Sequence, residues 1–268
     1  MLDTKLVIRD PQTSKKFREP FNSTVEFRNV SFRYPGAEED VLHDITFTAQ
    51  PGQTTAFIGS TGSGKSTVVN LIPRFYDITG GSILVDGTDI REVSQHDLRE
   101  KIGYIPQKGP LFSGTIESNL LYADENASLE TMNEAIEIAQ AAEFVTTRPE
   151  GMAAEISQGG ANVSQGQKQL LTIARAVLSN PRILILDEAT SSVDTRTEVL
   201  IQRAMNNLMK DRTSFIIAHR RSIIRDADWI LVMRDGDIVE QGSHEELLAQ
   251  GAFIAELYNS QFERAMVV

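Results

Sequence analysis

The chain has 268 residues, of which 41% are hydrophobic, so it is long and apolar enough to bury a core as one large domain or two small lobes. Its formal net charge of −11 argues against a nucleic-acid partner bound through a broad basic face, and the lack of cysteine excludes disulfide scaffolds and thiolate metal sites. No apolar run reaches the roughly 20 residues of a membrane span and the first residues are too charged for a secretory signal, so we expect the isolated polypeptide to be soluble.

Residues 1–23 are polar, contain two prolines and show no sustained period, which is typical of a linker or an extended arm. We expect folded structure to begin near Val25. The next part of the chain alternates short β-rich runs with turn pairs such as Pro51-Gly52 and Asp86-Gly87. Strands are predicted over residues 25–34, 45–48, 54–58, 82–85 and 102–105.

Between about residues 108 and 180 the periodicity becomes helical, most clearly over residues 128–147 and 164–179, which predicts a helical lobe. After Pro181 the pattern returns to strands and helices, and strands as apolar as these belong inside a sheet that is covered on both faces. The elements expected in this last part are a strand over 183–186, a helix over 197–210, a strand over 214–218, a hairpin turning at Asp235-Gly236, a helix over 245–250 opened by a Ser243/Glu246 capping box, and a final amphipathic helix over 253–266.

The segment GSTGSGKST, residues 59–67, lies between an apolar strand and a helix and has the composition of a phosphate-binding loop. Its three glycines let successive backbone N–H groups converge on anionic oxygens, while Lys65 supplies a positive charge and Ser66 a hydroxyl for Mg²⁺. A nucleoside triphosphate is the expected ligand, and a merely flexible loop is the alternative. The candidate contacts are Gly59, Ser60, Thr61, Gly62, Ser63, Gly64, Lys65, Ser66 and Thr67.

A second acidic site follows the strand ILIL, where Asp187 and Glu188 stand at the carboxyl end. Asp187 is expected to face the Mg²⁺ held by Ser66, through water, because Mg²⁺ gives up its hydration shell reluctantly. Glu188, one residue further on, is then placed to polarise a water for attack on the γ-phosphorus. The alternative is an acidic cluster that only marks the entry to a helix.

Two further polar residues are weaker candidates for the same site. His219 ends the apolar strand SFIIA and can donate a hydrogen bond to the γ-phosphate, although an isolated histidine in this position is more often structural. Gln107 follows Pro106 where the chain leaves the α/β part, and its amide can ligate Mg²⁺ or the attacking water from a hinge. A glutamine in a loop is usually only solvated.

The segment NVSQGQKQ and the tyrosine of FRYPG offer two possible ligand contacts. Ser164 stands as the N-cap of a periodic helix and Gly166 leaves its first turn bare, which suits either a second anion site or an ordinary capped helix. Tyr34 precedes a turn and can stack on a base, or can simply pack at the end of its strand.

Taken in chain order, these segments resemble the nucleotide-binding domain of an ATP-binding cassette (ABC) transporter over residues 24 to about 260. The motifs that carry the resemblance are FRYPG, GSTGSGKST, IPQ, VSQGQ, ILILDEAT with SSVD behind it, and IIAH. The wording of residues 80–120 resembles the exporter branch. The fold implied is α/β: a P-loop NTPase core with a mostly parallel sheet and flanking helices, an antiparallel β subdomain and an α-helical subdomain at about 108–180. Residues 1–23 are then a linker from a transmembrane domain.

The resemblance also implies a role for each matching residue. Tyr34 would stack on adenine, Lys65 and Ser66 would serve phosphate and metal, Gln107 would be the Q-loop residue and Mg²⁺ ligand, and Glu188 and His219 would be the catalytic pair. A set of residues would contact the ATP of a partner protomer across a dimer that sandwiches two ATPs: Ser164, Gly166, Gln167 and Asp194.

Two residues depart from the family pattern. Gln165 stands where a glycine is commonest in the signature, and Gln158 stands where many exporters have a glutamate that touches the membrane domain of the opposite subunit. The QGGAN wording beside Gln158 resembles some bacterial heterodimeric exporters, so the dimer can consist of identical or different chains.

The function expected is Mg²⁺-dependent ATP hydrolysis that drives export, with the chain at the cytoplasmic face of the cell (inner) membrane. Its partners would be a second nucleotide-binding domain and a transmembrane domain, with no nucleic acid. The alternative is a regulatory half of a heterodimer in which ATP holds the dimer together and hydrolysis is slow, but Glu188 argues against it. The sequence does not name the exported compound, because that specificity is expected to reside in the membrane region.

Overall fold

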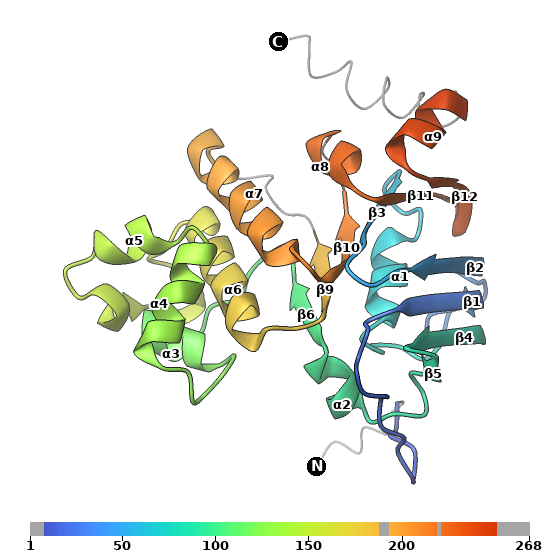
Figure 1. Ribbon diagram of the computed structural model, residues 1–268, viewed down its shortest axis with the longest axis horizontal. Coiled ribbons are helices and arrows are strands. Elements are labelled where there is room, and N and C mark those ends of the chain that lie inside the picture. Colours follow the sequence, from blue (N-terminus) through green and yellow to red (C-terminus); the bar gives the residue numbers. More distant parts are fainter. Residues whose placement is uncertain (1–7, 188–192, 219–220, 251–268) are drawn as a thin grey trace. The chain divides into compact units, whose positions relative to one another are not determined.

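The computed structural model describes residues 8–187, 193–218 and 221–250 (Figure 1). The described residues divide into two compact units, one lying within 1–102 and 213–268 and the other within 103–212. The fold class predicted from the sequence, an α/β core with antiparallel β and α-helical subdomains, is confirmed.

The first unit contains an antiparallel sheet with the strand order β2-β1-β4-β5. Its members are β1 (Val25–Phe32), β2 (Leu42–Ala49), β4 (Gly80–Val85) and β5 (Thr88–Asp89). Buried and exposed residues alternate over much of β2, because successive side chains of a strand point to opposite faces. One face of this sheet therefore contributes to the core, where Phe27 and Phe47 stack with ring centroids 4.6 Å apart.

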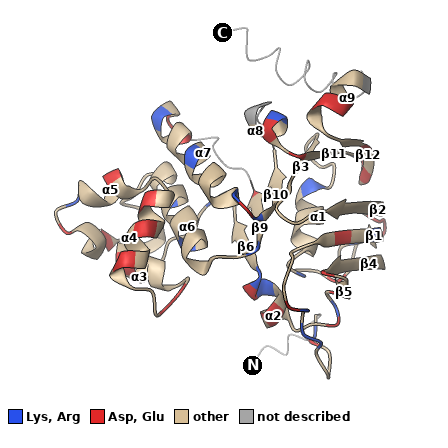
Figure 2. Ribbon diagram, viewed as in Figure 1, with Lys and Arg blue, Asp and Glu red and all other residues tan. Residues whose placement is uncertain are grey.

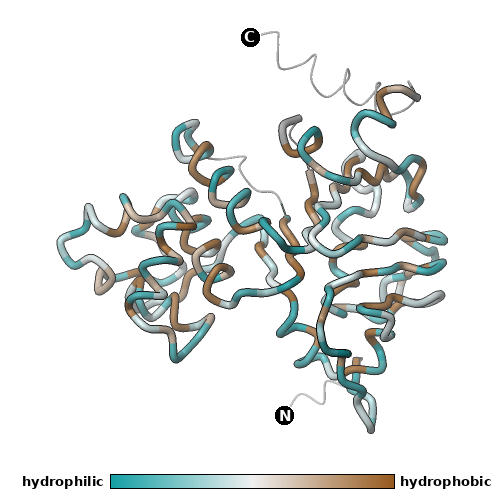
Figure 3. The backbone as a smooth tube through the Cα atoms, in the orientation of Figure 1, coloured by the Kyte–Doolittle hydropathy of each residue, from teal (hydrophilic) through white to brown (hydrophobic). Residues whose placement is uncertain are grey.

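The central strand of the first unit is β3 (Thr54–Gly59), which runs parallel to a neighbour on each side. These neighbours are β10 (Thr213–Ile217) and β11 (Trp229–Arg234), and β12 (Asp237–Gly242) pairs antiparallel to β11. Every residue of β10 is buried, and its last three residues are apolar, which is typical of a strand covered on both faces (Figure 3). The carboxyl ends of parallel strands share one edge, so the loop after β3 opens where ligands bind in this class of sheet.

The described helices of the first unit are α1 (Lys65–Leu71), α2 (Gln95–Glu100), α8 (Arg221–Asp226) and α9 (His244–Gln250). The short helices α2 and α8 were not predicted. The expected capping box opens α9: the Ser243 N–H donates to Glu246 Oε2 over 2.8 Å, and the Glu246 N–H donates to Ser243 Oγ over 3.3 Å. The helix expected over 253–266 lies outside the described residues.

The second unit is mainly helical. Its helices are α3 (Ile116–Leu121), α4 (Leu129–Ile138), α5 (Ala142–Thr146), α6 (Gln165–Ser179) and α7 (Thr195–Met209), and its short strands β7 (Gly114–Thr115) and β8 (Glu155–Ile156) form a small sheet. The exposed side of α4 carries carboxylates (Figure 2), in keeping with the acidic balance of the chain. Two longer strands, β6 (Ile102–Ile105) and β9 (Ile183–Asp187), are hydrogen-bonded neighbours.

The stretch 128–147, which was expected to be helical, contains two helices, α4 and α5. Gln140 stands between α4 and α5 with φ 56°, a left-handed conformation. Its N–H donates to the Glu137 carbonyl over 3.0 Å, and the Ala141 N–H donates to the Ile136 carbonyl over 2.9 Å. This pair of bonds is a Schellman motif, which ends a helix most often at a glycine, and the sequence has none at this point.

The described part of the N-terminal arm, residues 8–23, lies against other segments of the first unit. The Lys15 N–H donates to the Glu92 carbonyl over 2.8 Å, and the Lys15 ammonium pairs with the Glu92 carboxylate over 2.8 Å. Lys16 pairs with Asp97 over 2.8 Å. The arm is therefore fastened to the loop before α2 and to α2 itself. None of the helices within the described ranges is both long and apolar enough to cross a membrane.

Candidate functional site

The loop between β3 and α1 holds its shape through glycines with left-handed backbone conformations. Gly59, Gly62 and Gly64 have φ values of 148°, 85° and 103°. A Cβ on Gly59 would overlap the carbonyl oxygen of Met233 and lie 2.7 Å from Ser63 Oγ. The loop backbone lies so close to the neighbouring strand β11 that no side chain fits at position 59, and glycine is required there.

Lys65 points back into this loop. Its side chain is buried, with the residue 6% exposed, and Nζ donates to the carbonyls of Gly59 over 2.8 Å and Ser60 over 2.7 Å. These acceptors are neutral, and burial of the ammonium lowers the pKa of Lys65. A polyphosphate would supply the compensating negative charge, so the loop fits the predicted ligand.

The tip of the β11–β12 hairpin supports the phosphate loop from behind. The Gly236 N–H donates to the Ser63 carbonyl over 3.2 Å, and the Gly236 carbonyl accepts from the His43 N–H over 3.0 Å. A Cβ on Gly64 would lie 2.8 Å from Leu42 Cδ2, at the start of β2. The turn at Asp235-Gly236 was predicted, but its contact with the phosphate loop was not.

Tyr34 lies beside the same loop. Its hydroxyl is 3.0 Å from Thr67 Oγ1, in the first turn of α1. Its ring meets Phe32 and Tyr76 edge to face, with centroids 4.8 Å and 5.1 Å away. Tyr34 therefore packs near the end of β1, which is the structural interpretation given to it from the sequence. It also lies next to the phosphate loop. Its stacking on a base stays a prediction.

In the second unit, Asp187 ends β9 and is half-buried. The negative charge of Asp187 acts on Tyr104 of the neighbouring strand β6. Burial raises the pKa of Tyr104, and repulsion from the Asp187 carboxylate raises it further. Gln107 is exposed in the loop that follows β6. The expected catalytic residues Glu188 and His219 lie outside the described residues.

The helix α6 begins as expected at Ser164. The Gln167 N–H donates to Ser164 Oγ over 3.2 Å, and the Ser164 N–H donates to Gln167 Oε1 over 3.0 Å, which makes a capping box. A Cβ on Gly166 would overlap Thr197 Cγ2 and lie 3.0 Å from Val193 Cγ1. The glycine therefore permits close packing against the start of α7, and its contact with an anion stays a prediction.

Asp194 caps α7 by accepting a hydrogen bond from the Thr197 N–H over 3.0 Å. This backbone bond holds the pKa of Asp194 below its ordinary value. A cavity of about 320 Å³ adjoins both helix starts and brings Gln167 and Asp194 together. Its other lining residues are Gln140, Glu143, Phe144, Thr147, Leu170, Arg196, Thr197 and Leu200.

Sequence reasoning missed Arg175, which holds the segment after Gln107 against α6. Its Nη2 donates to the Pro110 carbonyl, its guanidinium lies 5.9 Å from the centre of the Phe112 ring, and burial lowers its pKa. The sequence signal that could have identified Arg175 is its place among mostly apolar residues in 170–176, where a charged side chain needs polar partners.

The candidate residues divide between the two units. Tyr34 and the phosphate loop belong to the first unit, whereas Gln107, Ser164, Asp187 and Asp194 belong to the second. The meeting of Lys65 and Asp187 around one triphosphate stays a prediction.

Residues 42–191 match the family described as ABC transporter. The chain is 54% identical over 227 residues to a fatty acid ABC transporter ATP-binding/permease protein of Mycobacterium tuberculosis, covering 84% of this chain and 36% of that protein. It is 46% identical over 243 residues to an ATP-dependent lipid A-core flippase of Syntrophus aciditrophicus, covering 91% of this chain and 40% of the flippase.

Among solved structures, a bacterial Atm1-family ABC exporter with ATP bound superposes with a TM-score of 0.89 at 39% identity, covering 97% of this chain and 45% of that chain. The chain thus spans less than half the length of each of these three proteins. The family match covers more than half of the 268 residues and includes the strand, glycine loop and helix described above. The chain therefore belongs to the ABC transporter family.

Proposed function

We propose that this chain binds ATP in the loop between β3 and α1 and hydrolyses it to power export across a membrane. The observation that carries the proposal is the buried Lys65 ammonium, held among neutral oxygens of a glycine loop, in a chain of the ABC transporter family. The relatives named ATP-binding/permease protein and lipid A-core flippase support export as the process that is driven.

The hydrolysis assigns a task to each candidate residue. Lys65 and the loop N–H groups bind the β- and γ-phosphates, and Tyr34 stacks on the base. Mg²⁺ held by Ser66, Gln107 and Asp187 would neutralise charge on the triphosphate.

Glu188 takes a proton from water as the water oxygen attacks the γ-phosphorus, and the bond from that phosphorus to the bridging oxygen of ADP breaks. His219 donates a hydrogen bond to the γ-phosphate. These two residues complete the proposed catalytic set.

The proposed partners are a second nucleotide-binding domain and a transmembrane domain, with the chain at the cytoplasmic face of the membrane. Ser164, Gly166, Gln167 and Asp194 would meet the ATP held by the second domain. The support is that Gln167 and Asp194 line one cavity beside the starts of α6 and α7. The solved relative is an exporter with ATP bound.

Lys65→Ala tests the binding site. Loss of a charge-assisted hydrogen bond of about 1.5–3 kcal/mol predicts ATP affinity lower by roughly tenfold to hundredfold, measured by calorimetric titration. Lys210→Ala, which removes an exposed lysine just after α7, is the matched control and should bind ATP as the wild type does. Wild-type affinity in Lys65→Ala would contradict the assignment.

A further inference from the structure

The helix that starts in the phosphate loop ends at an unusual residue. The Arg74 N–H donates to the Leu71 carbonyl over 3.0 Å, and the Phe75 N–H donates to the Asn70 carbonyl over 3.2 Å, which makes a Schellman motif after α1. Arg74 has φ 54° at the position where such motifs favour glycine. A strained arginine in this place suggests that its side chain has a task.

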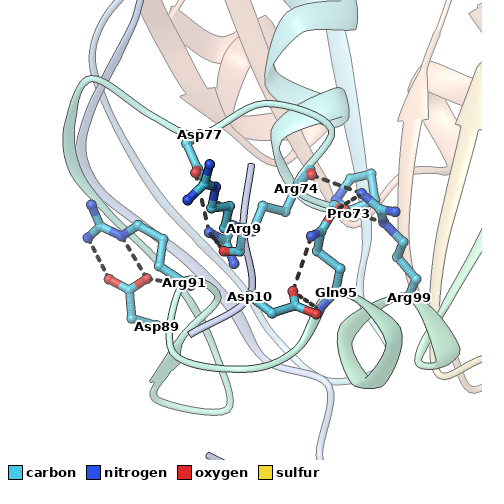
Figure 4. A network of polar contacts seen from close by, with 9 residues as sticks. All are labelled: Arg9, Asp10, Pro73, Arg74, Asp77, Asp89, Arg91, Gln95 and Arg99. Carbon is cyan, nitrogen blue, oxygen red and sulfur yellow. Dashed lines mark hydrogen bonds and ion pairs between the residues drawn. The ribbon is translucent and has the colours of Figure 1, made fainter. Parts of the chain in front are cut away.

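The Arg74 side chain is buried, with the residue 4% exposed, and joins two segments (Figure 4). Its Nε donates to Asp77 Oδ1 over 2.6 Å, and its Nη2 donates to the backbone carbonyl of Arg9 over 3.2 Å. Its Nη1 is also buried and has no acceptor among the described residues. The arginine thus fastens the N-terminal arm to the end of α1.

A second arginine holds the same helix end from α2. Arg99 donates from Nε to the Pro73 carbonyl and from Nη2 to the Arg74 carbonyl, both over 3.1 Å (Figure 4). Its guanidinium lies 5.4 Å from the centre of the Phe75 ring. A cation at these carbonyls is favourable because the C-terminal end of a helix carries partial negative charge.

The arm contacts α2 next to this point. Asp10 Oδ1 accepts from the Gln95 N–H over 2.9 Å and from Gln95 Nε2 over 3.1 Å (Figure 4). The backbone bond from Gln95 lowers the pKa of Asp10, and the charges of Arg74 and Arg99 lower it further. Consecutive arm residues, Arg9 and Asp10, therefore meet the end of α1 and the start of α2.

We propose that Arg74 is a positioning residue for the ATP site, which ties the arm to the far end of α1 and so holds the phosphate loop at the near end. The helix has 7 residues, so it is a rigid rod of about 10 Å. Displacement of its far end moves Lys65 and the first turn. Release of the arm therefore lowers ATP affinity while the chemical step is unchanged. This inference rests on the proposed function.

The test uses Arg74→Gly and Arg74→Asn in the full chain. Both residues accept the left-handed conformation, so the helix end can form without the side chain. Three quantities are measured: amide hydrogen exchange of residues 9–16 and 70–76, the dissociation constant of ATP, and kcat. We expect exchange at the arm to rise about tenfold, with ATP affinity about fivefold weaker and kcat within about twofold of wild type.

Two further variants frame the result. Asp10→Asn removes the charge of the arm carboxylate that accepts from Gln95. It should shift the exchange at the arm and the dissociation constant of ATP in the same direction by a smaller factor. Arg28→Ala removes an exposed arginine whose ion pair is with Glu26 on β1, and should shift neither.

The outcomes separate the inference from the proposed function. Wild-type affinity in both Arg74 variants would overturn the inference alone, as would unchanged exchange at residues 9–16. An effect in Arg74→Gly that is absent in Arg74→Asn would assign the change to glycine flexibility and also overturn it. A wild-type chain that binds no ATP would overturn the proposed function, and the inference with it.

Discussion

Gly166 has no room for a side chain, because Thr197 Cγ2 already lies where its Cβ would be. The same glycine stands in the first turn of α6, between the capping residues Ser164 and Gln167. Close packing of two helix starts is therefore a sufficient physical reason for glycine here, independent of any ligand.

Gly166→Ala should destabilise the chain by about 1–3 kcal/mol, because one added methyl in a packed contact displaces its neighbours. Urea denaturation measures the loss. Thr197→Ser removes the methyl that is in the way and keeps the backbone N–H that Asp194 accepts, so the double variant should recover most of the lost stability. No recovery would mean that another contact, such as Val193, sets the limit.

The start of α7 depends on a single exposed carboxylate. Asp194 accepts the Thr197 N–H and so satisfies one of the first N–H groups of the helix. Its pKa in the folded protein lies below its ordinary value of 3.8, so its contribution to stability is full above that value and is lost as the pH falls through the folded value.

Asp194→Asn isolates this effect, because asparagine caps helices as well as aspartate does and does not titrate. The urea midpoints of the two proteins should be close at pH 7. Below about pH 4 the midpoint of the wild type should fall relative to that of the variant. All other carboxylates cancel in this comparison. Parallel midpoints over the whole pH range would show that the charge of Asp194 adds nothing to the cap.

Helix ends show what the sequence could and could not predict. Pro-Gly and Asp-Gly turns marked the strands of the first unit, and Ser243 marked α9. The end of α1 at Arg74 and the end of α4 at Gln140 were not predicted. Both residues take the left-handed conformation that is usually adopted by glycine or asparagine. Such ends are decided by contacts that form only in the folded chain, such as the Arg74 pair with Asp77.

At the scale of the whole molecule, the candidate site was predictable where its residues are neighbours in the sequence. The phosphate loop is one contiguous segment whose spacing carries its chemistry. The support from Gly236 and the contact of Tyr34 with Thr67 join segments far apart in the sequence, and no local pattern announces them. Asp194 was identified as a site residue by resemblance, whereas its cap on α7 became clear only from the structure.

Glu188→Gln tests the proposed assembly. The variant should bind ATP, lose about two to four orders of magnitude in turnover with the general base, and accumulate as a dimer. Light scattering with and without ATP measures the mass, and Glu198→Gln, a substitution of the same kind on α7, is the control. Unchanged turnover would remove Glu188 as the base, and a monomer at high concentration would favour a different chain as the partner.

The support of the phosphate loop by the β11–β12 hairpin has a consequence for biosynthesis. Residues 59–65 leave the ribosome long before Gly236, whose N–H donates to Ser63, and before β11, which pairs with β3. A nascent chain stalled before residue 229 lacks both Gly236 and β11. We expect nucleotide affinity to arise only when β11 and β12 emerge from the ribosome. Competence to bind nucleotide is therefore expected late in translation, once β11 has paired with β3 and the β11–β12 hairpin has formed.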